Sequence, residues 1–251
     1  MRIGTRWTAM PAVDDICAAE RSGAFALWAD VATSAIAAAS ELAALTTDPR
    51  ILVRIVLGTE HPVTLAEEAA VLDHLSAGRV VCVVDSGALS LQDAIEDLQL
   101  LRACWSGRPV RHRGRRWQVP AGLADDMPDS VAVTPSPSQV ELPVWLTGEH
   151  AAGLAADFGL ALLATEYGDV SAVPQVQPGC VELTGEVNAD RELVSRWAAA
   201  GATHLLVRPP VAVGPDLFSG YIARYLQPEV AMPHFPRIMA ESDPPARWLP
   251  A

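Results

Sequence analysis

The sequence has no long, uninterrupted hydrophobic run. Half of its 251 residues are hydrophobic, but charges, glycine or proline interrupt the apolar segments before the roughly 18 residues that a membrane-spanning helix needs. The N-terminus, Met1–Gly4, has a basic residue but is followed by neither the apolar stretch nor the cleavage site of a secretory signal. These absences predict a soluble protein of the cytoplasm.

Cysteine is scarce and shows no spacing typical of a site. The four cysteines are Cys17, Cys82, Cys104 and Cys180, and no two of them form a CxxC pair. Neither a zinc site nor a disulfide framework is therefore indicated. We expect no bound metal and mostly buried, reduced thiols.

Positive charge is also in short supply. The formal net charge is -12, and the one basic cluster spans Arg108–Arg116. Such a balance opposes attraction to phosphate backbones. We therefore expect no nucleic-acid partner, and a small-molecule ligand or another protein is favoured.

What the sequence does have is a regular alternation of strand-like and helix-like segments. Short apolar runs predict eight strands, at Arg2–Trp7, Ala24–Ala29, Arg50–Leu57, Arg79–Val84, Pro143–Thr147, Leu160–Thr165, Cys180–Leu183 and His204–Arg208. Strands that are buried on both faces and separated by helices pair in parallel, either in an open doubly wound sheet or in a closed barrel. Eight strands favour the barrel, so we predict an α/β fold: a single (β/α)8 TIM barrel over residues 1–251, with shortened or irregular units.

Capping residues indicate where the intervening helices begin and end. Thr64 and Glu67 form a capping box, Ser90 and Asn188 are typical N-caps, and Gly23 and Gly201 suit the left-handed residue that follows a helix. The predicted helices are Val13–Arg21, Thr33–Leu45, Thr64 to Gly78, Ser90–Trp105, His150–Phe158, Asn188 to Gly201 and Asp216–Leu226.

Two segments interrupt the alternation. Residues Arg108–Gln139 are rich in Pro, Arg and Asp, and Arg111–Arg116 within them resembles the tip of a β-hairpin. This tip is either solvated or in contact with the anionic tail of a cofactor. The segment Thr165–Cys180 has no helical periodicity, so one unit is expected to be irregular.

Several motifs together resemble the luciferase-like monooxygenase family. The resemblance is carried by His61–Val63, Leu65–Ala70, Leu72–Val80, Trp105–Val110, His112–Gly114, Leu142–Leu146, Ala155–Gly159 and Gly201–His204. It covers most of the chain from about Ala19 to Arg208. It implies a barrel that binds FMN or coenzyme F420 at the C-terminal ends of its strands and performs two-electron transfer or oxygen activation.

Three positions depart from the pattern of that family. The turn after the fourth strand, Asp85–Ala88, is short and begins with an acid in place of a glycine-rich loop. The turn after the fifth strand contains Glu149, and no histidine follows Asp30. An acid beside a phosphate repels it unless its side chain points away.

The resemblance also implies where the functional residues lie. The cofactor-binding candidates are Thr59, Ser86, Gly87, Thr147, Gly148, Glu149 and His150, and the catalytic candidates are Asp30 and His61. Asp30 could accept a proton or cap a helix, and His61 could contact a ligand or cap the helix that follows it. Arg54 lies in an apolar strand and needs a partner, either Glu41, Glu60 or a ligand at the mouth of the barrel.

Two functions remain open from the sequence. The first is a flavin- or deazaflavin-dependent oxidoreductase or monooxygenase acting on a small organic substrate. The second is a degenerate barrel without cofactor that serves as a structural or ligand-binding partner. A homodimer is implied by the resemblance, and the alanine-rich helix Thr33–Leu45 suits close packing.

Overall fold

The structure, a computed structural model, describes residues 1–31, 33–121, 129–164, 178–208 and 221–222. The chain forms two compact units. Of the described residues, unit 1 comprises 1–31, 33–53, 161–164, 178–208 and 221–222, and unit 2 comprises 54–121 and 129–160. Each is described by itself.

Unit 1 is built on parallel strands with helices between them. Its elements are β1 (Arg2–Trp7), α1 (Val13–Arg21), β2 (Ala26–Ala29), α2 (Ala35–Leu45), the first part of β3 (Arg50–Val56), β8 (Ala161–Leu162), β9 (Pro178–Glu182), α7 (Val187–Ala199) and β10 (His204–Arg208). The strands pair in the order β3-β2-β1-β10-β9, and Ala164, just after β8, forms a parallel bridge with Gly179. Every pairing with a defined register here is parallel.

Glycine permits close packing in the core of unit 1. A Cβ on Gly4 would lie 2.6 Å from the carbonyl oxygen of Ala26, and a Cβ on Gly179 would lie 2.4 Å from the ring of the fully buried Trp197. Neither distance is possible for a real side chain, so β1 and β9 depend on glycine at these points.

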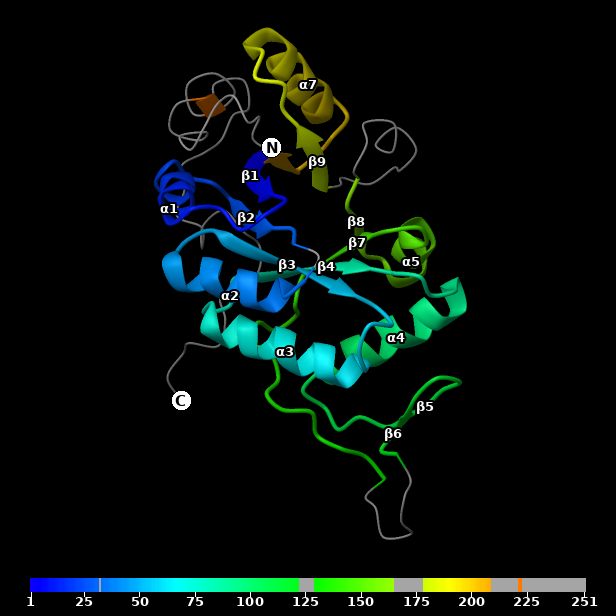
Figure 1. Ribbon diagram of the computed structural model, residues 1–251. Helices are drawn as coiled ribbons and strands as arrows, with labels where there is room; N and C mark the ends of the chain where they lie inside the picture. The colour runs from blue at the N-terminus through cyan, green and yellow to red at the C-terminus, as the bar shows by residue number, and fades with distance from the viewer. Residues whose placement is uncertain (32, 122–128, 165–177, 209–220, 223–251) are drawn as a thin grey trace. The chain divides into compact units, whose positions relative to one another are not determined.

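Unit 2 continues the same alternation from the second part of β3. Its further elements are α3 (Pro62–Leu75), β4 (Val80–Asp85), α4 (Leu91–Trp105), the short antiparallel hairpin of β5 (His112–Arg113) and β6 (Gln118–Val119), β7 (Val144–Thr147) and α5 (Ala151–Phe158). β4 lies between β3 and β7 and pairs with β7 in parallel, with Asp85 opposite Thr147. α3 and α4 pack side by side (Figure 1), and the indole nitrogen of Trp105 donates to the carbonyl of Ala66 at 3.1 Å.

A buried carboxylate holds the segment that leads into β7. Asp73 on α3 is fully buried and accepts hydrogen bonds from the hydroxyl of Ser138 at 2.7 Å and the amide of Gln139 at 2.9 Å. The side-chain amide of Gln139 donates to the same carboxylate at 2.7 Å. Because a buried carboxylate needs such partners, this short segment has a fixed path along α3.

The predicted order of strands and helices is confirmed in the described residues, with each of the eight strands in its expected place. The hairpin, the Ser90 cap, and the left-handed Gly23 and Gly201 are confirmed as well. The four cysteines are free, and Cys82, Cys104 and Cys180 are buried while Cys17 is half-buried. The helix expected over Asp216–Leu226 and the irregular segment after Thr165 lie outside the described residues, apart from Tyr221 and Ile222.

Two predicted helix starts were wrong. α3 begins at Pro62, and its N-cap is His61 instead of Thr64, because proline is well suited to the first helical position and His61 Nδ1 accepts the amide of Val63 at 3.1 Å. The N-cap of α7 is Glu186 instead of Asn188. The loop before α7 is held by Asp190, which accepts from the amide and hydroxyl of Thr184, both at 2.8 Å.

Candidate functional site

The carboxyl ends of β3, β4 and β7 meet at one edge of unit 2. Asp85 is the last residue of β4, and the amide of Leu57, just after β3, donates to its carbonyl at 2.9 Å. The amide of Ser86 donates to the carbonyl of Thr147, the last residue of β7, at 3.4 Å. We call this edge the rim of unit 2, and parallel strands with helical crossovers gather their ligand-binding loops at such an edge.

Five of the seven cofactor-binding candidates come together at this rim. Gly87 donates its amide to Asp85 Oδ1 at 2.9 Å, and His150 donates its amide to Ser86 Oγ at 3.4 Å. A Cβ on Gly148 would lie 2.3 Å from Asp85 Oδ1 and 3.1 Å from Ser86 Oγ. The group of Ser86, Gly87, Thr147, Gly148 and His150 is therefore one cluster, centred on the Asp85 carboxylate.

Glycine is required at position 148 for two reasons. Its φ of +94° lies in the left-handed region, and a side chain there would collide with Asp85. Gly148 is exposed and lies two residues before His150, the N-cap of α5. Because residue 148 has no side chain, the backbone near the positive N-terminal end of α5 stays accessible at this point.

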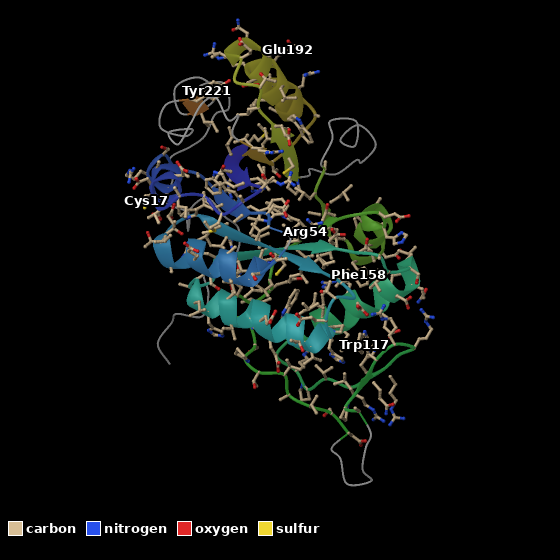
Figure 2. The ribbon with its side chains drawn as sticks, viewed as in Figure 1. Cys17, Arg54, Trp117, Phe158, Glu192 and Tyr221 are labelled. Atoms are coloured by element: carbon tan, nitrogen blue, oxygen red, sulfur yellow. The ribbon has the colours of Figure 1, made fainter. Side chains whose placement is uncertain are left out.

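Arg54 supplies the positive charge of the rim. Its guanidinium donates to Asp85 Oδ2 at 2.5 Å, and the Arg54 side chain stays 35% exposed while that of Asp85 is 12% exposed. Arg54 is labelled on the sheet of unit 2 in Figure 2. The sequence predicted that Arg54 needs a partner but did not identify Asp85 as that partner. The pair offsets the negative charge that made Asp85 a poor neighbour for a phosphate.

Thr59, Glu149 and His61 lie outside this cluster as far as the described contacts go. The Thr59 hydroxyl turns back to the carbonyl of Val56 at 2.7 Å, and Glu149 is exposed. His61 caps α3, as one of its two interpretations predicted, and its ring packs edge-on against Trp117 of the hairpin, with centroids 4.3 Å apart. Burial lowers the pKa of His61, although nearby Asp97 acts in the opposite direction.

Asp30 lies in unit 1 and is held by an arginine. Arg6 of β1 donates from Nη2 to Asp30 Oδ2 at 2.5 Å and from Nε to the same oxygen at 3.0 Å. The Arg6 guanidinium also lies 5.0 Å from the Trp28 ring centroid and 3.7 Å from Cys180 Sγ. Burial alone would lower the pKa of Arg6, but Cys180 and Asp30 together raise it. The suggestion that Asp30 caps a helix was wrong, because α2 begins at Ala35 with Ser34 as N-cap.

A buried pair of acids on α4, Glu96 and Asp97, was missed from the sequence. Glu96 accepts the backbone amides of Arg115, Arg116 and Trp117 at 2.9 to 3.1 Å, and His112 Nε2 lies 3.2 Å from it. Burial alone would raise the pKa of Glu96, but these hydrogen bonds lower it.

Asp97 completes the anchor of the hairpin. It accepts from Trp117 Nε1 at 2.6 Å and pairs with Arg116 Nε at 3.2 Å, while burial raises its pKa. The opposite charges of α4 and of Arg111–Arg116 were the signal that could have revealed this contact. Arg115 and Arg116 bind acids of α4, so the basic tip is an anchored hairpin and not simply a solvated one.

Two features are absent from the part of the chain that the structure describes. No group of three or more His, Cys, Asp or Glu side chains there could hold a metal ion. No helix among those residues combines the length and hydrophobicity needed to cross a membrane.

The fold and the rim define an α/β protein of the (β/α)8 TIM-barrel type, with polar groups gathered at the carboxyl ends of its strands. The profile of the luciferase-like monooxygenase family matches residues 11–178, which is more than half of the chain. The chain belongs to this family.

Solved structures share the fold at low sequence identity. The monooxygenase RslO1 from Streptomyces bottropensis is 13% identical, with a TM-score of 0.69 over 92% of this chain and 100% of that one. The coenzyme F420-dependent tetrahydromethanopterin reductase from Methanopyrus kandleri is 12% identical, with a TM-score of 0.69 over 90% and 98%. The oxygenating constituent of 3,6-diketocamphane monooxygenase from Pseudomonas putida, in complex with FMN, is 13% identical, with a TM-score of 0.69 over 93% and 99%. No curated protein matches the chain.

Proposed function

We propose that this chain is an oxidoreductase or monooxygenase that binds FMN or coenzyme F420 at the rim of unit 2 and acts on a small organic substrate. The observation that carries the proposal is the cluster of Arg54, Ser86, Gly148 and the start of α5 around Asp85. Family membership and the cofactors named for two similar structures support it.

The residues of the rim fit the anionic tail of such a cofactor. The uncovered backbone at Gly148 lies next to the positive end of α5, and the partly exposed Arg54 adds a cation. Thr147 and His150 bring further hydrogen-bonding groups to the same edge, whereas Ser86 is fully buried and holds the backbone amide of His150 in place. When bound, the cofactor would supply the two-electron chemistry, and the chain would bind and orient it.

His61 and Asp30 stay catalytic candidates. The lowered pKa favours the neutral imidazole of His61, and because its acceptor nitrogen Nδ1 already takes the amide of Val63, His61 would accept a proton only by releasing this cap. The carboxylate of Asp30 is held by Arg6, so we propose that Asp30 acts as a fixed negative charge near the end of β2. Thr59 and Glu149 remain proposed as outer contacts of the cofactor.

Titration of the purified protein with FMN and with coenzyme F420, followed by absorbance and fluorescence, tests the proposal. We expect saturable binding of one of them, and Arg54→Gln should weaken it by about tenfold, as loss of one charge-assisted contact would. Arg21→Gln, which makes the same change of charge at the exposed end of α1, should leave the affinity unchanged. Absence of binding to either cofactor would contradict the proposal.

The second candidate is a family member that has lost its cofactor. One observation favours it: the Asp85 carboxylate lies against Gly148, where it takes up space at the start of α5. If neither cofactor binds to the natural protein but Asp85→Gly restores binding, this second function replaces the first.

We also propose that residues 1–251 form one domain, because the family match runs through parts of both compact units. A cytoplasmic homodimer with no nucleic-acid partner is proposed as well. The net charge of -12 supports the last point.

A further inference from the structure

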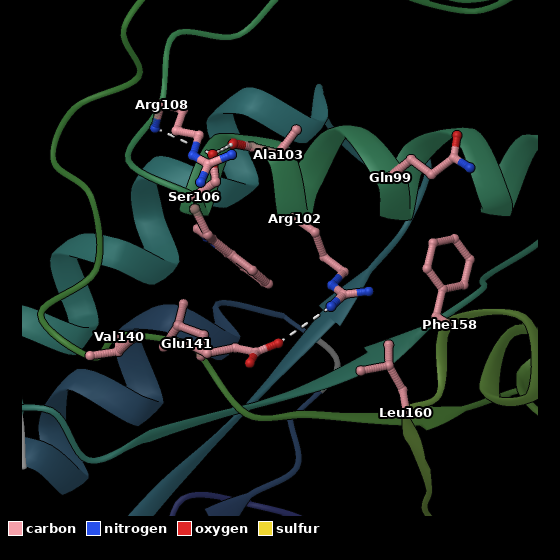
Figure 3. A pocket seen from close by; sticks show the side chains of 11 residues that line it. Gln99, Arg102, Ala103, Ser106, Arg108, Val140, Glu141, Phe158 and Leu160 are labelled. Atoms are coloured by element: carbon pink, nitrogen blue, oxygen red, sulfur yellow. Dashed lines mark hydrogen bonds and ion pairs between the residues drawn. The ribbon is translucent and has the colours of Figure 1, made fainter. Parts of the chain in front are cut away.

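A hollow of unit 2 lies away from the rim. It has a volume of about 570 Å³, within the range of small-molecule sites, and it is formed by the ends of α4 and α5 and by the segment 140–142 that leads into β7 (Figure 3). The rim lies past the other end of β7, at Thr147, about 15 Å further along the strand. The two places are therefore separate.

One of the two arginines of this pocket, Arg102, lies beside an exposed acid. Figure 3 shows its side chain reaching across the opening toward Glu141, whose Oε1 accepts from Arg102 Nη2 at 3.3 Å. Glu141 is 78% exposed, so this ion pair is weak and competes poorly with a better acceptor. The Arg102 guanidinium also lies 5.8 Å from the centroid of the Phe158 ring, which holds it over the pocket.

Apolar and aromatic side chains form part of the remaining walls, beside the polar Gln99 and Ser106. Trp105 is fixed by its hydrogen bond to Ala66, and Phe158 lines the opposite part of the pocket. Val140 is 64% exposed at the pocket, so its apolar surface remains in water unless a ligand covers it. Planar aromatic rings gain most from contact with such walls.

The net charge of the residues that line the pocket is positive, which favours an anionic ligand. Two arginines, Arg102 and Arg108, line the pocket against the single carboxylate of Glu141, although the whole chain carries a net charge of -12. A guanidinium is planar and binds a carboxylate through two parallel hydrogen bonds.

We propose that this pocket binds a planar aromatic carboxylate, with its carboxylate on Arg102 in place of Glu141 and its ring on the apolar walls. The site is independent of the proposed cofactor, because none of its lining residues belongs to the rim.

Calorimetric titration with 2-naphthoate tests the proposal, with the uncharged 2-naphthalenemethanol as the matched ligand. We expect saturable binding of the carboxylate and at least about tenfold weaker binding of the alcohol, because the alcohol has no charge for Arg102. Arg102→Gln should weaken the carboxylate by about tenfold. Glu141→Gln should tighten it, because the competing carboxylate is removed, and Arg111→Gln, with the same change of charge outside the pocket, should have no effect.

The proposal is overturned if 2-naphthoate shows no saturation in the millimolar range, if the alcohol binds equally well, or if Arg102→Gln binds like the natural protein. Circular dichroism establishes that each variant is folded. Should Arg102→Gln fail to fold, the exposed Glu141→Gln decides alone, with tighter binding for the proposal and unchanged binding against it.

Discussion

Arginines and backbone amides bind several key acids of the described chain. Asp30 is held by Arg6 and Asp85 by Arg54, each through a contact of 2.5 Å, and Glu96 accepts three consecutive backbone amides of the hairpin. Such acids are stable as anions because their charge is compensated where it is buried. At the rim of unit 2, Asp85 is therefore one half of an ion pair with Arg54 and not an isolated acid.

His61 gives the protein a specific pH dependence. The pKa of His61 is lowered in the folded state, so below the ordinary value of 6.5 the unfolded chain binds protons at His61 more readily than the folded chain does. The stability that neutral His61 contributes is therefore lost as the pH falls below 6.5. Protonation also removes the lone pair with which Nδ1 accepts the amide of Val63. Urea unfolding at about pH 7.5 and about pH 5 should show lower stability in acid.

The matched variant for this measurement is His61→Asn, which keeps a capping acceptor but does not titrate. Its stability should change less between the two pH values than that of the natural protein. An equal change in both proteins would show that His61 does not contribute to the pH dependence.

The sequence singled out Asp30, Asp85 and Arg54 but could not identify their partners. Arg6 and Asp30 are 24 residues apart, and Arg54 and Asp85 are 31 apart, so only the pairing of neighbouring strands brings them together. Glu96 and Asp97 gave no signal of their own, because acids within a helix are usually solvated. Residue types at strand ends were predictable, and the contacts between them were not.

At the scale of single elements, some glycines are required by close packing and others are not. A Cβ on Gly179 in β9 would lie 2.4 Å from the Trp197 ring, whereas the nearest atom to a Cβ on Gly153 in α5 would be Leu91 Cδ1 at 3.6 Å. Gly179→Ala should therefore destabilise the protein by about 1–3 kcal/mol through overpacking. Gly153→Ala should stabilise it by up to about 1 kcal/mol, since alanine is the better helix former.

Thermal or urea unfolding of the two variants measures both effects, and each variant is the control for the other because both add a single methyl group. Equal stabilities of the two variants would contradict this assignment of close packing to Gly179.

The sequence predicted the kind and order of elements better than their starts. Buried strands were recognised from apolar runs such as Val80–Asp85, and Gly201 marked the end of α7 correctly. The start of α3 was misplaced because the capping box at Thr64 and Glu67 competes with Pro62, and the ring of proline fixes the first turn earlier. For α7, Asp190 binds the preceding loop, a contact that a search for a local cap at Asn188 overlooks.

At the scale of the whole molecule, α2 offers a test of the proposed dimer. Ala37 and Ala44 are exposed and lie seven residues apart, so they share one face of this helix. Light scattering after size exclusion should give about twice the 26.6 kDa of one chain. Replacing both alanines by glutamate should lower the mass to that of one chain, because like charges would face each other in the interface.

Ala198→Glu, on the exposed end of α7, is the control and should leave the mass of the dimer unchanged. A natural protein that elutes with the mass of one chain would contradict the proposed dimer.

The burial of the thiols sets the labelling chemistry of this protein. Cys82, Cys104 and Cys180 are buried, and burial raises the pKa of each of them, so their reactive thiolates are suppressed in the folded state. Cys17 on α1 is half-buried, and the sequence contains no lysine. A maleimide dye would thus mark a single helix of the native chain, while an amine-reactive dye would find only the N-terminus, which gives two orthogonal attachment points for fluorescence without any mutation.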